Sequence, residues 1–366
     1  MSRIEDLIAE YCPDGVEYKR LGDVCKIKNG KDYKHLSAGD IPVYGSGGVM
    51  DVRVDTSVYN RPTVLLPRKG SIANVFYVDG PFWNVDTIFY TVIDEEQVIP
   101  RYLYHVMMNA HIENYSTGSA ARPSLTQSAL NKIEIPVPPL SVQDEIVRIL
   151  DSFSSLEAEL EAELEARRKQ YAYYRDQLIR DCPSIRWIPL SEISENCDKS
   201  RKPIKKEKRI AGKTPYYGAS GVVDYVDGFT HEGDYLLLSE DGANLLARSM
   251  PIAYQISGRN WINNHAHVLR IENANLRQLV EMYLNSISLE PYITKGAQPK
   301  LTKQRMETIV VPVPSEDDLS RIVEMLTKFY VLTTSLTNGL PAEIEARRKQ
   351  YEYYRDRLLS FDELAV

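Results

Sequence analysis

One stretch of eighteen residues occurs twice in the chain and constrains the fold more than any other feature. Residues 162–179 read AELEARRKQYAYYRDQLI, and residues 342–359 read AEIEARRKQYEYYRDRLL. Fourteen of the eighteen positions agree, at an offset of 180 residues in a chain of 366. Two copies this similar, half a chain apart, indicate a duplicated unit whose repeats each end in the same charged helix.

Shorter motifs repeat in the same order, so the duplication extends beyond the helices. PVYGSGGVMD at residues 42–51 is echoed by PYYGASGVVD at residues 215–224. Ser141 and Ser315 each stand three residues before an aspartate. This spacing predicts a capping serine at the start of both long helices. The sequence therefore predicts that the whole unit is repeated, loops included.

The segments that precede the two helices have the texture of short strands. Residues 63–66, 74–78 and 87–93 are rich in Val, Ile, Phe, Tyr and Thr, with Gly-, Asn- and Asp-rich turns between them. Helices are predicted at residues 2–11 and 100–114. We expect an α+β fold of two tandem domains, each followed by a long helix. The two long helices are expected to pack as an antiparallel coiled coil with pseudo-twofold symmetry.

The first long helix carries a heptad-like seam in which the steps alternate between three and four residues. A helix over residues 142–180 would be about 60 Å long, so it needs a partner helix. Arginine and tyrosine in the seam also fit a nucleic-acid stripe, but core packing explains them more simply. The predicted seam positions of both copies are Leu160, Leu164, Arg167, Tyr171, Tyr174, Leu178, Ile344, Arg347, Tyr351, Tyr354 and Leu358.

The second helix contains an insertion of four residues. The offset between the repeats is 176 residues at Phe153 and Phe329 but 180 in the repeated stretch. The inserted region includes Gly339 and Pro341, and proline costs a helix interior about 3 kcal/mol. A break near residues 338–341 is predicted, with a stutter of the seam as the alternative. The predicted domains are residues 1–140, 141–182 (first spacer helix), 183–314 and 315–366 (second, broken spacer helix).

Several classes of function are disfavoured by missing motifs. The sequence contains no GxxxxGK[ST] or GxGxxG phosphate loop, no [ND]PPY tetrapeptide and no HExxH pair. His265 and His267 alternate along a predicted strand, where one packed histidine and one at a loop edge are favoured over a metal site. The four cysteines lack ligand spacing and fit reduced thiols. We expect a cytoplasmic protein without catalysis, metal or bound cofactor.

Charge is distributed unevenly along the chain. The net charge of −7 argues against a uniformly basic surface. Residues 199–209 nevertheless hold seven basic residues against one acid, a cluster suited to phosphates or to a solvated loop. The acid excess lies in the helices, with six basic against ten acidic residues in 141–182 and seven against ten in 315–366. This distribution permits DNA-facing domains beside protein-facing helices.

The repeated pattern resembles a known family. Each helix reads [LI]EARRKQYxYYRDxL[IL], and each is preceded by PxLTxxxxxxxxxPVP, at residues 123–138 and 299–314. Together these motifs resemble the specificity subunit of type I restriction–modification systems, over essentially the whole chain. The resemblance implies a non-catalytic protein with two target recognition domains. Each would read one half of a bipartite, asymmetric site in double-stranded DNA.

The resemblance also implies partners. The two helices would set the distance between half-sites and dock two methyltransferase subunits. Endonuclease subunits that translocate DNA would join this core in the full complex. Adenine-N6 methylation would use S-adenosylmethionine bound by the methyltransferase partner, and no cofactor would be bound by this chain.

A protein that reads two different half-sites should keep its scaffold and vary its contact loops, because base contacts specify sequence. Residues 67–71 (PRKGS) align with residues 239–243 (SEDGA). Residues 83–87 (WNVDT) align with residues 261–265 (WINNH). These loops differ far more than the helices do.

Some loop residues match particular bases. Arg68 or Lys69 could address guanine, and Asn264 could address adenine, although a turn or a phosphate contact is as plausible for each. The loops at residues 118–122 and 295–300 favour phosphate contact. The candidate DNA-binding residues are Ser46, Gly47, Arg68, Lys69, Ser71, Asn74, Arg122, Lys205, Lys206, Ser220, Asn244, Arg248, Asn264, His265, Lys295, Gln298 and Lys300.

Two alternatives belong to other functional classes. A structural adaptor would carry two protein-binding domains on a coiled-coil spacer. An autonomous restriction and methylation enzyme would require catalytic motifs that the sequence lacks.

Overall fold

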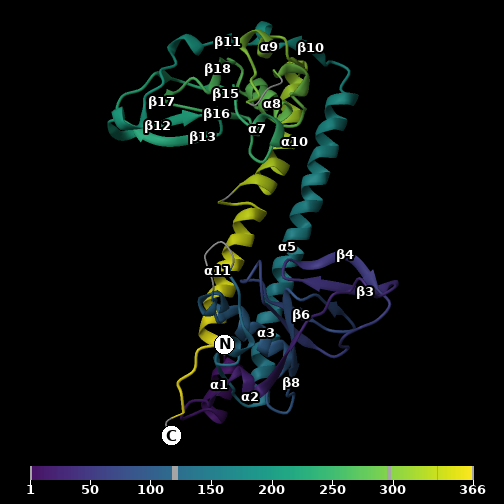
Figure 1. Cartoon of the computed structure of the whole chain (residues 1–366). Coiled ribbons are helices and arrows are strands. Elements are labelled where there is room, and N and C mark those ends of the chain that lie inside the picture. The colour runs from purple at the N-terminus through teal and green to yellow at the C-terminus, as the bar shows by residue number, and fades with distance from the viewer. Residues whose placement is uncertain (1, 118–122, 295–297, 336, 365–366) are drawn as a thin grey trace. The chain divides into compact units, whose positions relative to one another are not determined.

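The chain forms two compact units in a computed structural model that describes residues 2–117, 123–294, 298–335 and 337–364 (Figure 1). Unit 1 comprises Met1–Ala162 and Ala342–Val366, and unit 2 comprises Glu163–Pro341. Unit 1 is therefore built from both ends of the chain, whereas unit 2 is continuous. None of the helices in the described ranges is long and apolar enough to span a membrane.

Unit 1 combines two sheets and a strand pair with helices. Its antiparallel four-stranded sheet has the order β2 (Cys25–Asn29), β8 (Ile88–Ile93), β5 (Thr63–Pro67), β6 (Phe76–Val78). A three-stranded sheet has the order β4 (Gly48–Val54), β3 (Ala38–Gly45), β7 (Trp83–Asn84), and β1 (Tyr18–Arg20) pairs with β9 (Glu134–Pro136). The helices are α1 (Ser2–Tyr11), α2 (Leu21–Val24), α3 (Pro100–Asn109), η1 (Ile112–Tyr115), α4 (Gln127–Leu130), the start of α5 (Leu140–Asp181) and most of α11 (Leu340–Leu358).

Unit 2 repeats this order of strands and adds an edge strand, β14 (His231–Glu232), to its second sheet. Its sheets run β11 (Glu195–Asn196), β18 (Ala266–Arg270), β15 (Tyr235–Ser239), β16 (Ala253–Ile256) and β13 (Gly221–Val226), β12 (Ala211–Gly218), β17 (Arg259–Ile262), β14, and β10 (Arg186–Pro189) pairs with β19 (Val310–Val313). The helices are the end of α5 with α6 (Leu190–Ile193), η2 (Asp198–Ser200), η3 (Lys206–Lys208), α7 (Asn244–Ala247), α8 (Ala274–Leu284), η4 (Glu290–Tyr292), α9 (Lys303–Glu307) and α10 (Glu316–Thr334). The predicted α+β fold with an internal repeat is confirmed.

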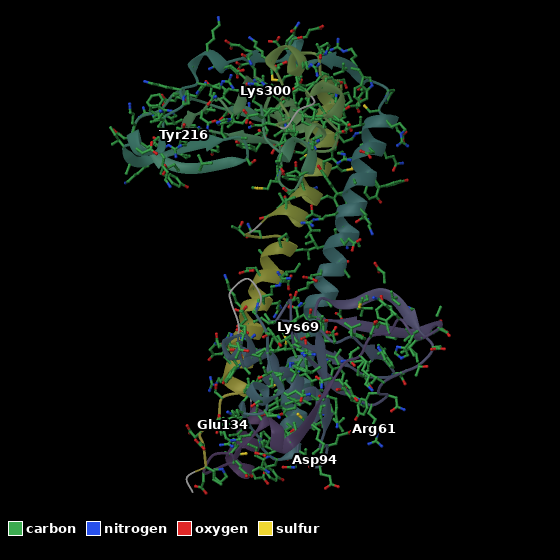
Figure 2. All side chains as sticks on the ribbon, in the orientation of Figure 1. Arg61, Lys69, Asp94, Glu134, Tyr216 and Lys300 are labelled. Carbon is green, nitrogen blue, oxygen red and sulfur yellow. The ribbon has the colours of Figure 1, made fainter. Side chains whose placement is uncertain are left out.

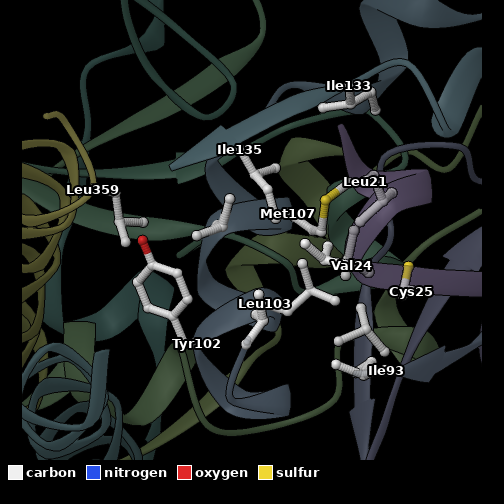
Figure 3. Packing of buried hydrophobic residues seen from close by; sticks show 14 of the residues in the cluster. Leu21, Val24, Cys25, Ile93, Tyr102, Leu103, Met107, Ile133, Ile135 and Leu359 are labelled. Carbon is white, nitrogen blue, oxygen red and sulfur yellow. The ribbon is translucent and has the colours of Figure 1, made fainter. Parts of the chain in front are cut away.

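The main core of unit 1 lies between α3 and the four-stranded sheet. Tyr102, Leu103 and Met107 of α3 are fully buried, and Leu103 and Met107 lie four residues apart on one face of the helix (Figure 3). Leu359, just after α11, joins the same cluster of buried residues (Figure 3). The Tyr102 hydroxyl donates to the Pro136 carbonyl at 3.1 Å, so its one polar atom is satisfied. The C-terminal segment is thus part of the core of unit 1.

In unit 1 the start of α5 packs against α11. Phe153 stacks on Tyr354 with ring centres 5.3 Å apart. Further along α5, Glu157 and Glu161 each lie 2.5 Å from the guanidinium of Arg348. Positions rise along α5 as they fall along α11, so the pair is antiparallel.

In unit 2 the end of α5 packs against α10. Tyr171 lies 6.2 Å from Tyr330, and Tyr174 lies 5.6 Å from Phe329, between ring centres. Leu326 is fully buried in the apolar cluster that joins these helices to α8. Each copy of the repeated stretch therefore packs against the first part of the other long helix: residues 342–359 against the start of α5, and residues 162–179 against α10. Both pairs are antiparallel.

Three predicted helix boundaries can be compared with the structure. α10 ends at Thr334 and α11 begins at Leu340, so the second helix is in two pieces, as the insertion predicted. Pro341 lies in the first turn of α11, where the missing amide hydrogen is tolerated. The predicted helix at residues 100–114 is wrong at its end, because α3 stops at Asn109 and His111 is left-handed (φ 46°).

Of the two predicted helix caps, one is confirmed and one is wrong. Ser315 caps α10, where its side chain accepts a hydrogen bond from the Asp318 amide. The predicted cap at Ser141 is wrong, because α5 begins one residue earlier and Ser141 lies inside it. The side chain of Gln143 instead ties this turn to the domain, since its amide donates to the Pro138 carbonyl at 2.8 Å.

Candidate functional site

Three loops converge at one end of β5 in unit 1. Ser46, at the tip of the β3–β4 hairpin, donates its amide to Thr87 Oγ1 at 3.2 Å. The side chain of Asn74 donates to the Ser46 carbonyl at 3.1 Å. The Arg68 amide, just after β5, donates to the Thr87 carbonyl at 2.9 Å. The hairpin tip, the loop after β5 and the turn before β8 are thereby joined.

A fourth segment closes this group of loops. The Leu125 amide donates to the Arg68 carbonyl at 2.9 Å, and Ser124 forms a β-bridge with Lys69. We call the four segments together loop cluster 1: residues 45–48, 67–74, 84–87 and 124–125.

The cations of loop cluster 1 differ in exposure. Arg68 is half-buried, with its guanidinium 5.9 Å from the centre of the Phe89 ring and 3.3 Å from the Asp86 carbonyl. The side chain of Lys69 is 52% exposed, and its ammonium lies 3.7 Å from Asp86 Oδ2 (Figure 2). A surface ion pair this open contributes little energy, so the Lys69 ammonium is available to a phosphate.

The same four segments converge in unit 2. The Glu240 amide donates to the His265 carbonyl at 2.9 Å, and the Leu301 amide donates to the Glu240 carbonyl at 2.7 Å. Asp241 forms a β-bridge with Lys300. The Ser239 hydroxyl donates to the carbonyl at the hairpin tip between β12 and β13. We call residues 218–221, 239–244, 263–266 and 298–301 loop cluster 2.

At two positions loop cluster 2 carries an acid where loop cluster 1 carries a cation. Arg68 and Glu240 receive the same backbone bond from the leucine of the PxLT motif, and Lys69 and Asp241 form the same bridge. In unit 2 the acid Asp241 pairs with His265, whose Nδ1 lies 2.9 Å from its carboxylate. One backbone scaffold thus carries two different sets of side chains.

Comparison with known proteins identifies the family. The family described as the type I restriction modification DNA specificity domain matches residues 13–166 and 187–346. The chain belongs to this family. Its match twice over, once per unit, agrees with the internal repeat.

Relatives in the specificity family cover different shares of the chain. The type I restriction enzyme EcoR124I/EcoR124II specificity subunit of Escherichia coli is 32% identical over 296 residues, 74% of this chain and 73% of the relative. A putative specificity subunit of Haemophilus influenzae is 36% identical over 184 residues, which span 49% of this chain and 47% of that relative. The solved S subunit of M. genitalium has the same fold, with a TM-score of 0.63 at 18% identity over 94% of this chain and 95% of that one.

The family match bears on the class of function. Its domain is described as one of DNA specificity. This description favours DNA over another protein as the target of these loops, and so disfavours the adaptor. The specificity family is also a non-catalytic class of subunit within type I systems, in keeping with the sequence motifs.

Several residues predicted to bind DNA lie in the two loop clusters. Ser220, Asn264 and Gln298 are exposed in loop cluster 2, and Gly47 is exposed in loop cluster 1. At the hairpin tips Gly48 and Gly221 have φ of +110° and +122°, which glycine adopts without strain. The clusters also contain the predicted residues Ser46, Arg68, Lys69, Ser71, Asn74, Asn244, His265 and Lys300.

Other predicted residues lie elsewhere. Lys205 and Lys206 are exposed on the segment before β12, whose Ile204 amide donates to the Tyr216 hydroxyl at 3.0 Å. Arg248 directs its guanidinium to the carbonyls at the end of α8, including Leu284 at 3.2 Å. Within loop cluster 2 the Asn244 side chain folds back on its own loop, donating to the Met250 carbonyl at 3.0 Å. Arg122 and Lys295 lie outside the described residues.

Sequence reasoning missed a buried ion network beneath loop cluster 2. Although burial raises the pKa of the Asp198 carboxyl, hydrogen bonding and charge from His267 bring it below its ordinary value. Burial likewise raises the pKa of Glu240, but Arg201 and Lys300 lower it overall.

The sequence prediction for the two neighbouring histidines is confirmed. His267 is buried and His265 is exposed, so one is packed and the other lies at a loop edge.

Proposed function

We propose that this chain is the DNA specificity subunit of a type I restriction–modification complex, in which each unit reads one half of a bipartite, asymmetric site. The observation that carries this proposal is the pair of loop clusters. Both are built from the same four segments with the same backbone bonds. Their side chains differ in charge, as two readers of different half-sites require.

The exposed side chains supply both kinds of DNA contact. Lys69 and Lys300 are about half exposed and suit phosphates, which position a protein on the duplex (Figure 2). Asn264, at the position that Asp86 holds in unit 1, suits the N6 and N7 atoms of adenine. Arg68 suits the O6 and N7 atoms of guanine. Lys205 and Lys206 add positive charge on a neighbouring segment of unit 2.

We further propose that the repeated helix stretches dock two copies of one methyltransferase subunit. Tyr173 and Tyr353 occupy equivalent positions and are 64% and 57% exposed. Arg175 contacts Asp176 at 2.7 Å, and the same pair recurs at the same distance 180 residues later. Two matching surfaces suit two identical partners. The spacer helices of residues 141–182 and 315–366 would thus serve assembly, and residues 1–140 and 183–314 recognition.

The chemistry of such a complex would belong to its partners. The methyltransferase subunits would bind S-adenosylmethionine and methylate adenine, and endonuclease subunits that translocate DNA would complete the restriction complex. This assembly would act on cellular DNA in the cytoplasm. The present chain would supply recognition and spacing without binding a cofactor.

Exchange of one recognition segment tests the proposal. The full chain is produced with the methyltransferase subunits of its system, and methylated adenines are mapped in the DNA of the producing cells. Replacing residues 13–140 with those of another specificity subunit is expected to change one half of the methylated motif and leave the other half and the gap unchanged. A change in both halves, or the absence of a bipartite motif with the unaltered chain, contradicts the proposal.

A protein-binding adaptor remains the contrasting function. An adaptor would assemble with partners through its helices yet show no sequence preference for DNA. Binding of the assembled complex to a randomised duplex library separates the two, because only a specificity subunit enriches a motif.

A further inference from the structure

Five ionisable side chains form a network beneath loop cluster 2. His267 Nδ1 lies 2.7 Å from Asp198 Oδ2 and 3.7 Å from Glu240 Oε2. Arg201 contacts both carboxylates, at 3.2 Å and 2.5 Å. Lys300 lies 3.0 Å from the second oxygen of Glu240. The His267 side chain is 1% exposed, so the centre of the network is closed to solvent.

These side chains are better explained as an ion network than as a metal site. The ligand atoms of Asp198, Glu240 and His267 lie within 4.8 Å of one another, which a cation could bridge. Arg201 and Lys300 already supply the positive charge, and between them they contact both oxygens of Glu240. Buried carboxylates paired in this way need no further cation.

The network is attached to the backbone of the loops that carry the candidate DNA contacts. His267 Nε2 donates to the Leu301 carbonyl at 2.8 Å, because a carbonyl can only accept. Arg201 donates to the Ala266 carbonyl at 2.8 Å. Asp198 accepts from the Val268 amide at 2.8 Å. The exposed residues of loop cluster 2 are therefore next in the chain to backbone groups that the network holds in place.

In unit 1 the equivalent positions beneath loop cluster 1 carry different side chains. Arg68 stands where unit 2 has Glu240, and Phe89 stands where unit 2 has His267. The Arg68 guanidinium faces the Phe89 ring at 5.9 Å, a cation–π contact. Unit 1 therefore stacks a cation on an apolar ring where unit 2 joins two acids, an imidazole and two cations.

We propose that Glu240, His267 and Arg201 are positioning residues for one half-site: they fix the geometry of loop cluster 2 and thereby set which base pairs unit 2 accepts. The inference rests on the proposed function. Glu240, His267 and Arg201 contact no DNA themselves, because their side chains lie under the loops and are at most 15% exposed. Their loss alters how Asn264 and Lys300 are presented, and loop cluster 1 is unaffected.

The test uses the full chain assembled with the methyltransferase subunits of its system. The half-site of unit 2 is first identified as the half of the motif that changes when residues 183–314 are exchanged. Duplexes with single substitutions in each half-site are then offered to His267→Phe, Glu240→Gln and the double variant Glu240→Arg/His267→Phe, which introduces the pair found in unit 1. Glu232→Gln, in an exposed pair with Arg259, is the matched control.

The single variants are expected to lose roughly tenfold in discrimination at the unit 2 half-site, about what one base pair contributes. Discrimination at the unit 1 half-site and assembly with the methyltransferase should not change. The double variant is expected to alter the preferred sequence of the unit 2 half-site. Equal losses at both half-sites, or unchanged discrimination in folded variants, overturn the proposal.

Folding and recognition are separated by two further measurements. Thermal unfolding of each variant shows whether unit 2 remains folded. Glu240→Gln keeps the size and an acceptor oxygen of the side chain, so it decides the question if His267→Phe does not fold. If the unaltered complex methylates no bipartite motif, the proposed function itself fails, whatever the variants show.

Discussion

The guanidinium carbon of Arg68 lies 5.9 Å from the centre of the Phe89 ring. At the equivalent positions of unit 2, Glu240 Oε2 lies 3.7 Å from Nδ1 of His267. The two positions have therefore changed as a pair between the repeats. In each unit the charged side chain at the first position faces a ring that suits it, a phenyl ring for the guanidinium of Arg68 and an imidazole for the carboxylate of Glu240.

Arg68 and Lys69 are neighbours with different predicted roles. Arg68→Ala is expected to relax discrimination at one base pair of the unit 1 half-site by about 1–3 kcal/mol, the energy of a bidentate base contact. Lys69→Ala should weaken binding to all duplexes alike and reduce the slope of log affinity against log salt by about one. Competition binding of the assembled complex at several salt concentrations measures both. An altered base preference in Lys69→Ala would show that the roles are misassigned.

Leu326 and Met325 are adjacent on α10 but face different surroundings. Leu326 is fully buried against α5 and α8, whereas Met325 is 42% exposed. Leu326→Ala is expected to lower the free energy of unfolding of unit 2 by about 2–5 kcal/mol, because it leaves a cavity. Met325→Ala should change it much less. Denaturant unfolding of the two variants tests this, and equal effects would mean that the helix pair is not packed as described.

Ser315 and Ser141 stand in the same sequence pattern but only one of them caps a helix. Ser315→Ala is expected to cost about 1 kcal/mol of stability, since the Asp318 amide loses its acceptor. Ser141→Ala should be close to neutral, because Ser141 lies exposed within the first turn of α5. Thermal unfolding compares the two, and a larger loss in Ser141→Ala would contradict the assigned start of α5.

His105 gives unit 1 a sensitivity to acid. Burial lowers the pKa of its imidazole, against a hydrogen bond to the Asp151 carboxylate that raises it. The unfolded chain, with an ordinary histidine pKa of about 6.5, therefore takes up a proton before the folded chain does. The contribution of His105 to stability is full above this pH and declines as the pH falls through 6.5 toward the lower folded pKa.

Unfolding at pH 7.5 and at pH 5.5 tests the role of His105. His105→Phe is expected to reduce the difference in stability between the two pH values. His231, whose pKa is also lowered by burial, keeps some difference in unit 2. His111→Phe is the control, because the His111 side chain is 71% exposed. An unchanged difference in His105→Phe would exclude this histidine as the source.

Periodicity and repetition predicted much of the fold. The copies at residues 162–179 and 342–359 predicted a duplicated α+β chain, and the Gly339–Pro341 insertion predicted the break between α10 and α11. Alignment of the divergent loops also selected Arg68, Lys69 and Asn264, which lie in the two clusters. Repetition is informative here because a pattern that occurs at equivalent positions of both repeats is a stronger indication of structure than the same pattern seen once.

Contacts between distant residues could not be predicted from the sequence. Glu240 stands 39 residues from Arg201 and 27 from His267, and no local pattern links them. The failure at Ser141 has a different cause, since the same capping motif occurs at Ser315 and only backbone geometry shows which serine precedes its helix. The inward direction of Arg248 likewise depends on the position of α8.

The chain segments that make up each unit determine which unit can complete its fold first during synthesis. Unit 2 is one continuous segment, Glu163–Pro341, so every residue of its core has been made before the last helix is translated. Unit 1 needs Leu358 and Leu359 for its core, and the Val16 amide bonds to the Asp362 carbonyl. Domains usually complete folding from the N-terminus as the ribosome proceeds. In this chain the first recognition unit to begin is the last to be finished.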